Sequence, residues 1–542
     1  MTTVLDPRPP AVTKPLSPAP RLDDLAGRRV LLFDNGKLAP EYGARRAIFD
    51  VLRDRLPAEA ANIALDERGR DMLRLDLDEI AEFAGALEAT GVDAVVLALV
   101  DAGVGMPTTV LAVELERRGI VTCTICEGPG LGLAAACAVG EAPFLPLVHL
   151  PVLQGADRER ISQYATVAIP EIVAALTGPA RLTAGTADVR RPGRRSESGH
   201  LDVEGADPTV AFTELMAGVG LGDGFPLVAP TPERVAGLLE TMDEDPDAVV
   251  WPVLPLRGTE VVARDIAVVA AMAGARPLWM PVIMAAYRGM ALPEFRLFQA
   301  AITTHPGGTL VLVSGPDTER LQIASGPGCL GPGYHANAAI GRAVALSFSF
   351  LLGSLPGGAD LTIQGSPAEY SYCCAEDLAA SPWPGLHADQ VGGETTVTVL
   401  RCEGPKNVLD HLSQTPESLL TGVARACATI HSNNAYLPGA QTVVFLNPAH
   451  AALLAEAGWA KADVAHYLFE QARNPRAALA GRGISPLWPD SFADLDPVPV
   501  AHGPEDFLVV VAGAPGLASQ VAIPWGLSHA VTTTLSGRVL NS

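Results

Sequence analysis

The chain has 542 residues, and its hydrophobic content of 48% is enough for several cores. At about 150 residues per domain, this length predicts roughly three domains. The formal net charge is −22 and no basic stripe is present, which argues against nucleic-acid binding. Prolines interrupt the start of the chain, no signal peptide is visible, and no apolar run approaches the roughly 20 residues that span a bilayer. Eight cysteines in so long a chain do not indicate a disulfide framework. We therefore expect a cytoplasmic protein without nucleic-acid or membrane partners.

Residues 1–26 are predicted to be an irregular, Pro-rich arm that could dock on the body of the protein. From 27 to 178, strand and helix patterns alternate along the sequence. The predicted strands are 29–33, 93–100, 121–125 and 145–150, and the predicted helices are 43–56, 76–89, 107–118, 133–139 and 157–177. Such alternation predicts an α/β domain with a parallel sheet.

Three loops follow strands of this sheet, at 34–37, 101–109 and 127–132, and we expect them to meet at one edge. In open α/β sheets small ligands bind at this edge, and the amino end of a helix favours an anion. Asp101 is the predicted catalytic residue of this edge, as a general base or a metal ligand, although it could simply cap the turn. The residues predicted to bind the substrate here are Asn35, Lys37, Gly103, Gly105, Thr108, Thr109 and Glu127.

Residues 179–205 are predicted to be a linker, and their basic run at 190–196 is typical of a solvated tether. A second α/β domain is predicted over 206–400 and a third over 401–542. In the second, strands are predicted at 248–254, 277–284 and 309–313, with helices at 260–273, 294–303 and a buried one from 335 to about 352.

The third domain carries a weak similarity to the second. Residues 309–316 resemble residues 442–448, and each stretch is an apolar strand that ends in a proline turn. A glycine and then a helix start follow in both places. We interpret this pattern as two related α/β units, although chance similarity between two strand–helix units would look the same. The predicted fold is thus a multidomain α/β protein.

Short stretches spread over almost the whole chain carry a resemblance to a known family. They are Val-Leu-Asp-Pro (4–7), Asp-Asn-Gly-Lys (34–37), Val-Glu-Leu-Glu-Arg-Arg-Gly-Ile (113–120), Leu-Gly-Pro-Gly (330–333), Tyr-Ser-Tyr-Cys (370–373), Ser-Pro-Trp (381–383), Lys-Ala-Asp (461–463) and Val-Val-Ala-Gly (510–513). In these stretches the chain resembles the UGSC-motif selenoprotein family. That family's naming motif, Sec/Cys-Gly-Ser-Cys, is similar to the redox motif of glycine reductase component B selenoproteins, which implies thiol or selenol chemistry in a typical member.

This sequence departs from the family pattern at the motif itself. The motif should fall at about 101–104, where the chain reads Asp-Ala-Gly-Val, and no cysteine occurs through Thr109. A thiolate nucleophile requires sulfur. We therefore do not expect thiol redox chemistry at this position.

Further candidates lie in the second domain. Cys373 and Glu376, which match the family pattern, are close in sequence to His387, and a thiol with a nearby base could be a nucleophile. His335 could act as an acid, a base or a ligand, and Arg342 could pair with a substrate carboxylate. Asn337 is a further predicted binding residue. The predicted catalytic residues here are thus His335, Cys373, Glu376 and His387, and His335, Glu376 and His387 could together hold a metal ion.

These observations favour an enzyme that acts on a small anionic organic substrate by acid–base or nucleophilic chemistry of the lyase, hydrolase or isomerase type. Two alternatives stay open: a Cys373-dependent reductase or transferase, and a non-catalytic binding subunit. No cofactor is predicted, apart from the possible metal ion, and we expect a homo-oligomer.

Overall fold

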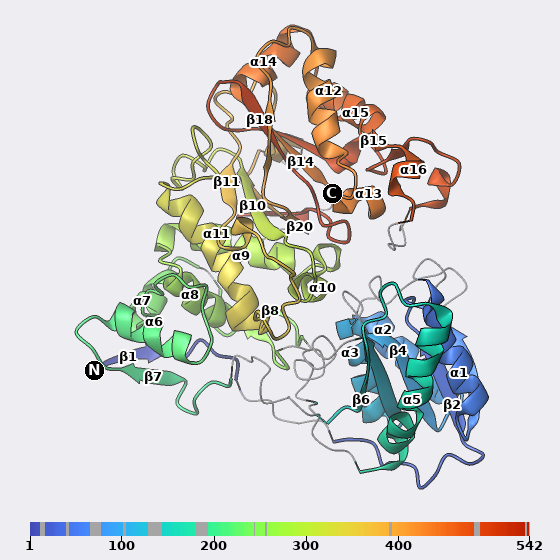
Figure 1. Cartoon of the computed structure of the whole chain (residues 1–542). Helices are drawn as coiled ribbons and strands as arrows, with labels where there is room; N and C mark the ends of the chain where they lie inside the picture. The colour runs from blue at the N-terminus through green and yellow to red at the C-terminus, as the bar shows by residue number, and fades with distance from the viewer. Residues whose placement is uncertain are drawn as a thin grey trace.

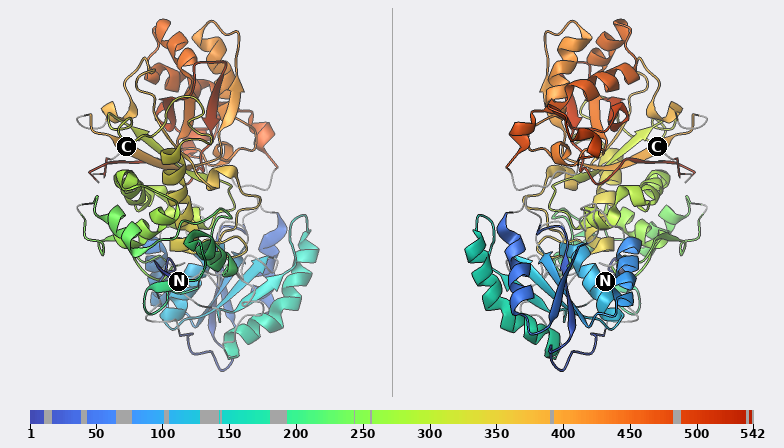
Figure 2. Two further views of the ribbon diagram at one scale, coloured as in Figure 1. Left: turned by 90° about the vertical axis from the view of Figure 1, so that its left-hand side faces the viewer. Right: turned by 90° about the vertical axis from the view of Figure 1, so that its right-hand side faces the viewer.

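The computed structural model shows a chain of three α/β regions, an N-terminal domain, a middle unit and a C-terminal unit (Figure 1). The structure describes residues 1–10, 17–38, 43–64, 77–100, 105–127, 142, 144–179, 193–242, 244–254, 257–389, 393–481, 488–536 and 539–540. The middle unit lies between the other two regions, as the side views also show (Figure 2). None of the helices in these ranges has both the length and the apolar surface needed to cross a lipid bilayer.

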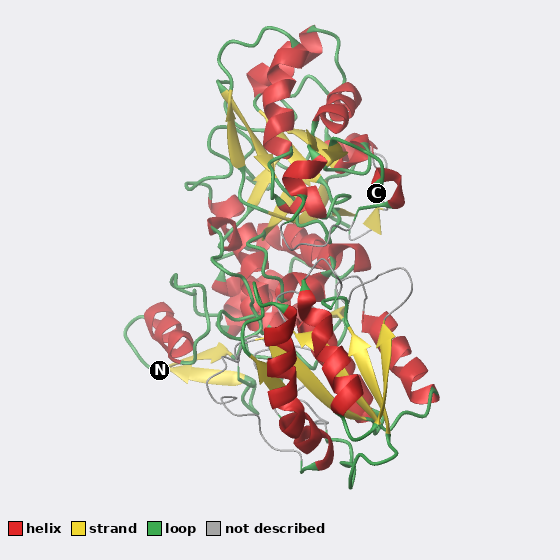
Figure 3. Ribbon diagram, turned by 45° about the vertical axis from the view of Figure 1, so that its right-hand side comes forward, coloured by secondary structure: helices red, strands yellow, loops and turns green. Residues whose placement is uncertain are grey.

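The N-terminal domain is built on the predicted parallel sheet. Its strands lie in the order β3-β2-β4-β5-β6 and all neighbours run parallel. They are β2 (Arg29–Asp34), β3 (Glu59–Ala64), β4 (Ala94–Val100), β5 (Val121–Glu127) and β6 (Leu147–Leu150). Every residue of β4 is buried, because helices cover both faces of the sheet (Figure 3). A strand buried on both faces needs apolar side chains on both sides, which explains the unbroken apolar run.

Two pairs of helices cover this sheet. On one face, α1 (Ala47–Arg55) contacts α5 (Arg158–Thr177), and on the other α2 (Leu77–Ala89) contacts α3 (Gly105–Arg117). The strand order changes direction between β2 and β4. In doubly wound sheets of this order, ligands bind at such a point, at the carboxyl ends of the strands. Strands β2, β4 and β5, which precede the predicted loops, end at this one edge of the sheet, while 101–104 and 128–132 lie outside the described residues.

The N-terminal arm and the end of the linker belong to the body of the protein. Strand β1 (Thr2–Leu5) pairs antiparallel with β7 (His200–Val203), far from the rest of the N-terminal domain (Figure 1). The expected solvated tether is also partly buried, since Arg195 forms an ion pair with Asp265 at 2.5 Å. In the described part of the basic run, 193–196, the positive charge of Arg195 thus neutralises a buried carboxylate instead of facing solvent.

The middle unit has a five-stranded sheet in the order β11-β10-β12-β19-β20. Helices α9 (Met280–Met290) and α11 (His335–Ser347) pack on its outer face, and α8 (Ala263–Met272) packs on these two helices. The strands are β10 (Gly308–Ser314), β11 (Cys373–Ala375), β12 (Thr396–Cys402), β19 (Val531–Thr534) and β20 (Val539–Leu540). Strands β10 and β11 are parallel, and the other neighbours are antiparallel.

The C-terminal unit repeats this arrangement with four strands. The order is β13-β18-β14-β17, in which β14 and β17 are parallel and the other neighbours are antiparallel. The strands are β13 (Lys406–Leu409), β14 (Thr442–Leu446), β17 (Phe507–Val511) and β18 (Ala518–Ala522), and helices α12 (Pro416–Cys427), α14 (Pro448–Glu456) and α15 (Lys461–Gln471) cover the outer face. The inner faces of the two sheets share one hydrophobic cluster, so the units form four layers, helix–sheet–sheet–helix.

The two units exchange strands. After β12 in the middle unit, the chain enters β13, which pairs with β18 of the C-terminal unit. After β18, the chain returns as β19 and pairs with β12. At the crossing, the Glu403 amide donates to the Ile523 carbonyl (2.8 Å) and the Trp525 amide donates to the Arg401 carbonyl (2.9 Å). These two bonds are equivalent in the two units, which agrees with the relationship that the sequence indicates between 309–316 and 442–448.

One predicted strand is a helix. The sequence favours a strand over 277–284, but these residues form the short 3-10 turn η4 (Pro277–Trp279) and the first half of α9. Almost every side chain of α9 is buried, so its sequence is apolar on all sides and has no helical period. Without that period, a short apolar run does not distinguish a buried helix from a buried strand.

Smaller elements complete the described chain. They are α6 (Pro208–Gly218), α7 (Pro232–Leu239), β8 (Val249–Trp251), β9 (Val261–Val262), α10 (Leu297–Ala301), the π-helix η6 (Phe348–Leu352), the 3-10 helices η2 (Ala44–Arg46), η5 (Pro293–Phe295), η7 (Pro367–Glu369), η8 (Leu386–Asp389), η9 (Asp490–Phe492) and η10 (Pro504–Asp506), and α13 (Asn433–Tyr436), β15 (Arg473–Asn474), α16 (Arg476–Leu479) and β16 (Val498–Pro499).

Candidate functional site

At the edge of the N-terminal sheet, the side chain of Asn35 forms hydrogen bonds that link neighbouring elements of the domain. Its side chain is fully buried, and its Nδ2 donates to the Leu99 carbonyl and to Thr108 Oγ1, both at 2.9 Å. Its Oδ1 accepts from the Leu99 amide at 2.9 Å and from the Lys37 amide at 3.2 Å. These bonds join β2, β4 and α3. Asn35 and Thr108 are thus engaged within the protein rather than directed at a ligand.

The other predicted residues of this edge are placed as follows. Glu127 pairs with Arg45 at 2.6 Å and accepts from the Leu153 amide at 2.8 Å. Thr109 is buried and donates to the carbonyl of Gly105, the first residue of α3. Lys37 is half-buried. Asp101 and Gly103 lie outside the described residues, so the catalytic role of Asp101 stays a prediction.

In the middle unit, α11 carries three predicted residues, and the structure separates them. His335 is exposed at the start of the helix, where its Nε2 lies 3.1 Å from the Gly274 carbonyl. Asn337 is buried and binds the backbone of the preceding loop, with bonds to Ala324 and Cys329.

Arg342 does not have the role that the sequence predicts. Its guanidinium forms a bidentate pair with Asp223, with Nε–Oδ2 at 2.7 Å and Nη2–Oδ1 at 2.9 Å. A carboxylate of the protein thus occupies the two donors that a substrate carboxylate would use.

Cys373 lies in strand β11 among the hydrophobic side chains between the sheet and its helices. Its side chain is buried, and burial strongly raises the pKa of its thiol. A reactive cysteine needs the thiolate form and access to its substrate. The structure therefore gives Cys373 the surroundings of a structural thiol, and it does not support the predicted nucleophile.

Glu376 and His387 do come together, in a polar cluster between the middle and C-terminal units. Ser314 Oγ donates to Glu376 Oε2 at 2.6 Å and lies 3.1 Å from His387 Nδ1. Lys461 of α15 reaches across from the C-terminal unit and pairs with Glu376 Oε1 at 2.6 Å. We call these four residues the seam cluster. The Glu376 side chain is fully buried, and the Leu386 amide also donates to it.

The seam cluster does not extend into a metal site. Within the described ranges, no group of three or more His, Cys, Asp or Glu side chains is placed to hold a metal ion. His335 contacts Gly274 and Trp279 and is not a member of the cluster. The predicted set of His335, Glu376 and His387 is therefore not assembled.

A separate cavity of about 600 Å³ opens at the other end of β10, and we call it the Arg401 pocket. Its walls come from the end of α11, the π-helix η6, the chain from 354 to 370, and the paired strands β10 and β12. Its polar lining includes Asp223, Thr309, Ser349, Ser354, Asp360, Thr362, Gln364, Ser366, Glu369 and Arg401, and its apolar lining includes Ala300, Ala345, Leu346, Phe348 and Pro356. Ligand sites have this size and this mixture of apolar walls and a few polar groups.

Arg401 is the unusual residue of this pocket. Arg401 of β12 lies opposite Thr309 of β10. It is on the same face of the sheet as Val397 and Val399, near the end of the strand. The residue is only 6% exposed, and its Nη1 makes a long bond of 3.3 Å to Thr309 Oγ1. Its Nε is buried without a hydrogen-bond partner. Burial lowers the pKa of Arg401 to about 10, so the guanidinium is still charged at neutral pH.

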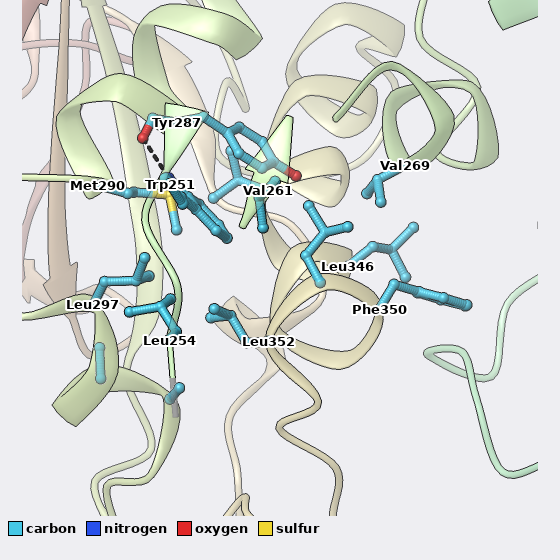
Figure 4. Close-up of a cluster of buried hydrophobic side chains, with 14 of the residues drawn as sticks. Trp251, Leu254, Val261, Val269, Tyr287, Met290, Leu297, Leu346, Phe350 and Leu352 are labelled. Carbon is cyan, nitrogen blue, oxygen red and sulfur yellow. Dashed lines mark hydrogen bonds between the residues drawn. The ribbon is translucent and has the colours of Figure 1, made fainter. Parts of the chain in front are cut away.

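Aromatic and helical geometry hold Arg401 in place. The Phe348 ring centroid lies 4.8 Å from the guanidinium carbon, a distance at which a cation and an aromatic ring attract each other. Phe348 begins the π-helix η6, and single π-turns within helices occur frequently at functional sites. Leu346, two residues earlier, also lines the pocket and belongs to the packed cluster of Figure 4. In that cluster, Trp251 Nε1 donates to the Tyr287 carbonyl at 2.8 Å. The wall of the pocket is thus part of a rigid core.

Two carboxylates face the same cavity. Glu369 ends the 3-10 helix η7, and its Oε2 accepts from the Ser366 amide at 3.1 Å. Burial raises the pKa of Glu369, and the nearby Asp360 adds to this while Arg401 opposes it. The turn approaches β10 so closely that a Cβ on Gly308 would lie 2.2 Å from the Ala368 carbonyl oxygen. Glycine at 308 is therefore required for Glu369 to reach the pocket.

Sequence reasoning missed the Arg401 pocket, although a signal was present. Arg401 is the single charged residue in Thr-Val-Thr-Val-Leu-Arg-Cys (396–402), a strand whose residues are all buried. A charged residue is seldom fully buried unless it is paired. Its carboxylate neighbours follow the helix 335–352 in a Gly- and Pro-rich stretch, which gave no motif.

The comparisons with known proteins concern the other end of the chain. The family model of the UGSC family matches residues 3–178, which include β1 and the N-terminal domain. No curated protein matches the chain. The seam cluster and the Arg401 pocket lie outside the matched residues, and the relationship to glycine reductase selenoproteins stays a prediction. Over these residues, the N-terminal third of the chain is similar to the UGSC family.

Proposed function

We propose that this protein is an enzyme that binds a small organic carboxylate in the Arg401 pocket and acts on it by acid–base chemistry. One observation carries the proposal: a buried guanidinium faces a cavity and has no carboxylate partner among the described residues. The proposal keeps the substrate class expected from the sequence and moves the site from the N-terminal sheet edge to the middle unit.

The energetics of Arg401 favour an anionic ligand. A buried charge without a partner costs several kcal/mol, because its lost hydration is not replaced. A carboxylate in the pocket would restore that interaction, and the planar guanidinium can give it two parallel hydrogen bonds. Nη1 makes only the long bond to Thr309 Oγ1, and Nη2 makes no hydrogen bond to the described residues, so these two nitrogens are the donors left for such a bidentate bond.

Glu369 supplies the acid–base function in this proposal. Its raised pKa brings the carboxyl group closer to neutral pH, where a group that both accepts and donates a proton is most effective. Lyase, hydrolase and isomerase reactions on an organic acid all need such a proton transfer. The Cys373 alternative loses support, because that thiol is buried in the core. A binding protein without turnover would use the same Arg401 contact but would not need Glu369 as a base.

Binding of matched ligands tests the proposal. Calorimetry on the full chain would compare 3-phenylpropionate with its neutral amide, which has nearly the same shape. We expect the acid to bind about 10-fold or more tightly than the amide, because a charge-assisted bond contributes about 1.5–3 kcal/mol. In Arg401→Met, whose side chain fills similar space, the advantage of the acid should disappear. Equal binding of acid and amide, or an advantage that survives in Arg401→Met, would overturn the proposal.

A further inference from the structure

The charged side chains that line the Arg401 pocket are not complementary to a ligand that carries only a carboxylate. Asp223 is neutralised by its bidentate pair with Arg342. This leaves one cation, Arg401, and two carboxylates, Asp360 and Glu369, facing the same cavity. A ligand with a single negative charge would satisfy Arg401, but it would be repelled by both carboxylates.

Both carboxylates keep acceptor capacity for a ligand. Glu369 uses Oε2 for the Ser366 amide, and Asp360 uses Oδ1 for the amide and hydroxyl of Thr362, at 3.0 and 2.6 Å. Glu369 Oε1 and Asp360 Oδ2 make no hydrogen bond to the residues described in this structure, and both residues line the cavity. Each carboxylate thus keeps one oxygen that can accept a hydrogen bond from a ligand.

The three charges are close enough to act on one molecule, yet they do not pair directly. Arg401 and Asp360 both influence the pKa of Glu369. Over the described part of the chain, however, no carboxylate forms an ion pair with Arg401, and its one hydrogen bond goes to Thr309. The cavity is therefore lined by a positive residue, Arg401, and by two negative residues, Asp360 and Glu369, that do not pair with it.

We infer that the ligand of this pocket is a zwitterion of the amino-acid type, whose carboxylate binds Arg401 and whose ammonium group binds Glu369 and Asp360. This inference rests on the proposed function, because it uses the same Arg401 contact. A zwitterion adds no net charge to the pocket, gives Arg401 a carboxylate, and places its ammonium group against both carboxylates. At about 600 Å³, the pocket has room for an amino acid with a large side chain.

Two sets of three probes test the inference on the full chain by calorimetry. The first set is L-phenylalanine, 3-phenylpropionate and phenethylamine, which share a skeleton and differ in charge. The second is 5-aminopentanoate, pentanoate and pentylamine, in which the two charges are further apart. In at least one set, we expect the zwitterion to bind about 10-fold or more tightly than the other two members.

Variants separate the two charges of the ligand. Glu369→Gln should remove the advantage of the zwitterion over the carboxylate and leave carboxylate binding in place, and Asp360→Asn provides an independent second variant. Arg401→Met should remove carboxylate binding in both sets. If the carboxylates bind as tightly as the zwitterions, or if neither carboxylate variant affects the ammonium preference, the inference is wrong while the proposed function stands. If the amines bind most tightly and Arg401→Met has no effect, both are wrong.

Discussion

The Arg401 pocket and the seam cluster lie at opposite ends of strand β10, and they treat buried charge in opposite ways. In the seam cluster, Glu376 accepts hydrogen bonds from Ser314, the Leu386 amide and Lys461, all between 2.6 and 2.7 Å. In the pocket, the buried guanidinium of Arg401 has one long bond to a hydroxyl group. The comparison shows that a cluster of residue types common in catalysis, such as Glu376, His387 and Lys461, does not by itself identify a ligand-binding site. What distinguishes the pocket is a buried charge beside a cavity that no described carboxylate pairs with.

The largest expected effect is in the seam cluster. Lys461→Met would leave the buried Glu376 carboxylate without its counter-ion, and we expect the free energy of unfolding to fall by about 3 kcal/mol. Denaturant unfolding measures this loss. The double variant Lys461→Met, Glu376→Gln should regain most of it, because no buried charge remains. A loss below about 1 kcal/mol in the single variant would show that the ion pair does not hold the units together.

The second prediction compares two buried arginines. Arg257 and Arg401 both have a pKa lowered to about 10 by burial, but Arg257 is paired with Asp265 at 2.6 Å. Without ligand, we expect Arg257→Met to lose about 2–3 kcal/mol of stability, and we expect Arg401→Met to lose none, because it removes an unpaired buried charge and leaves no partner charge behind. Thermal and denaturant unfolding of both variants measure the difference. Equal losses would mean that Arg401 has a structural partner and that the contrast between pocket and seam is wrong.

The third prediction extends the comparison to the N-terminal domain. Asn35→Ala removes the bonds to Leu99 and Thr108 and leaves buried groups unsatisfied, so we expect a loss of about 2 kcal/mol. Thr108→Val, which removes one of these bonds, should lose about 1 kcal/mol. Binding of 3-phenylpropionate should not change in either variant. If Asn35→Ala abolished that binding while the protein stayed folded, the N-terminal edge rather than the Arg401 pocket would hold the ligand.

The smallest effect concerns pH. Because burial raises the pKa of Glu369, its protonated form favours the folded state, and this contribution is full below the ordinary value near 4.5 and is lost as the pH rises through the raised pKa. Glu369→Gln should therefore lose less stability than the wild type as the pH rises from about 4 to 7. Asp506, whose pKa burial raises to about 6, is the control outside the pocket. Asp506→Asn should flatten the same range of the stability profile, but only Glu369→Gln should also alter the pH dependence of L-phenylalanine binding.

Much of the fold follows from local patterns in the sequence. The apolar run of β4 and the alternation of strands and helices predict the parallel N-terminal sheet, and the likeness of 309–316 to 442–448 predicts two related units. The pattern fails for α9, because a helix buried on all sides has no periodicity. The exchange of β13 and β19 could not be predicted, since it depends on pairing between strands more than 100 residues apart.

The site was harder to predict for the same reason. Glu376 and His387 were selected correctly as neighbours, but their partner Lys461 is 85 residues from Glu376, and sequence gave no sign that its charge neutralises the glutamate. Arg342 was a reasonable carboxylate-binding candidate until Asp223, 119 residues away, was found to occupy it. A sequence shows which residues carry chemistry, and only the fold shows which of them are already paired.

The exchanged strands have a consequence for how the molecule can be divided. The N-terminal strand β1 pairs with β7 beside the middle unit, β13 completes the C-terminal sheet, and β19 completes the middle one. A break between the regions would remove a paired strand from the sheet of the fragment that remains and expose the backbone groups of its neighbour. The middle and C-terminal units should therefore unfold in one cooperative transition, and neither half, expressed alone, should be stable. The sequence divides into apparent domains, but strands from one region complete the sheet of another. Insertions in loops should therefore be tolerated better than truncations at the domain boundaries.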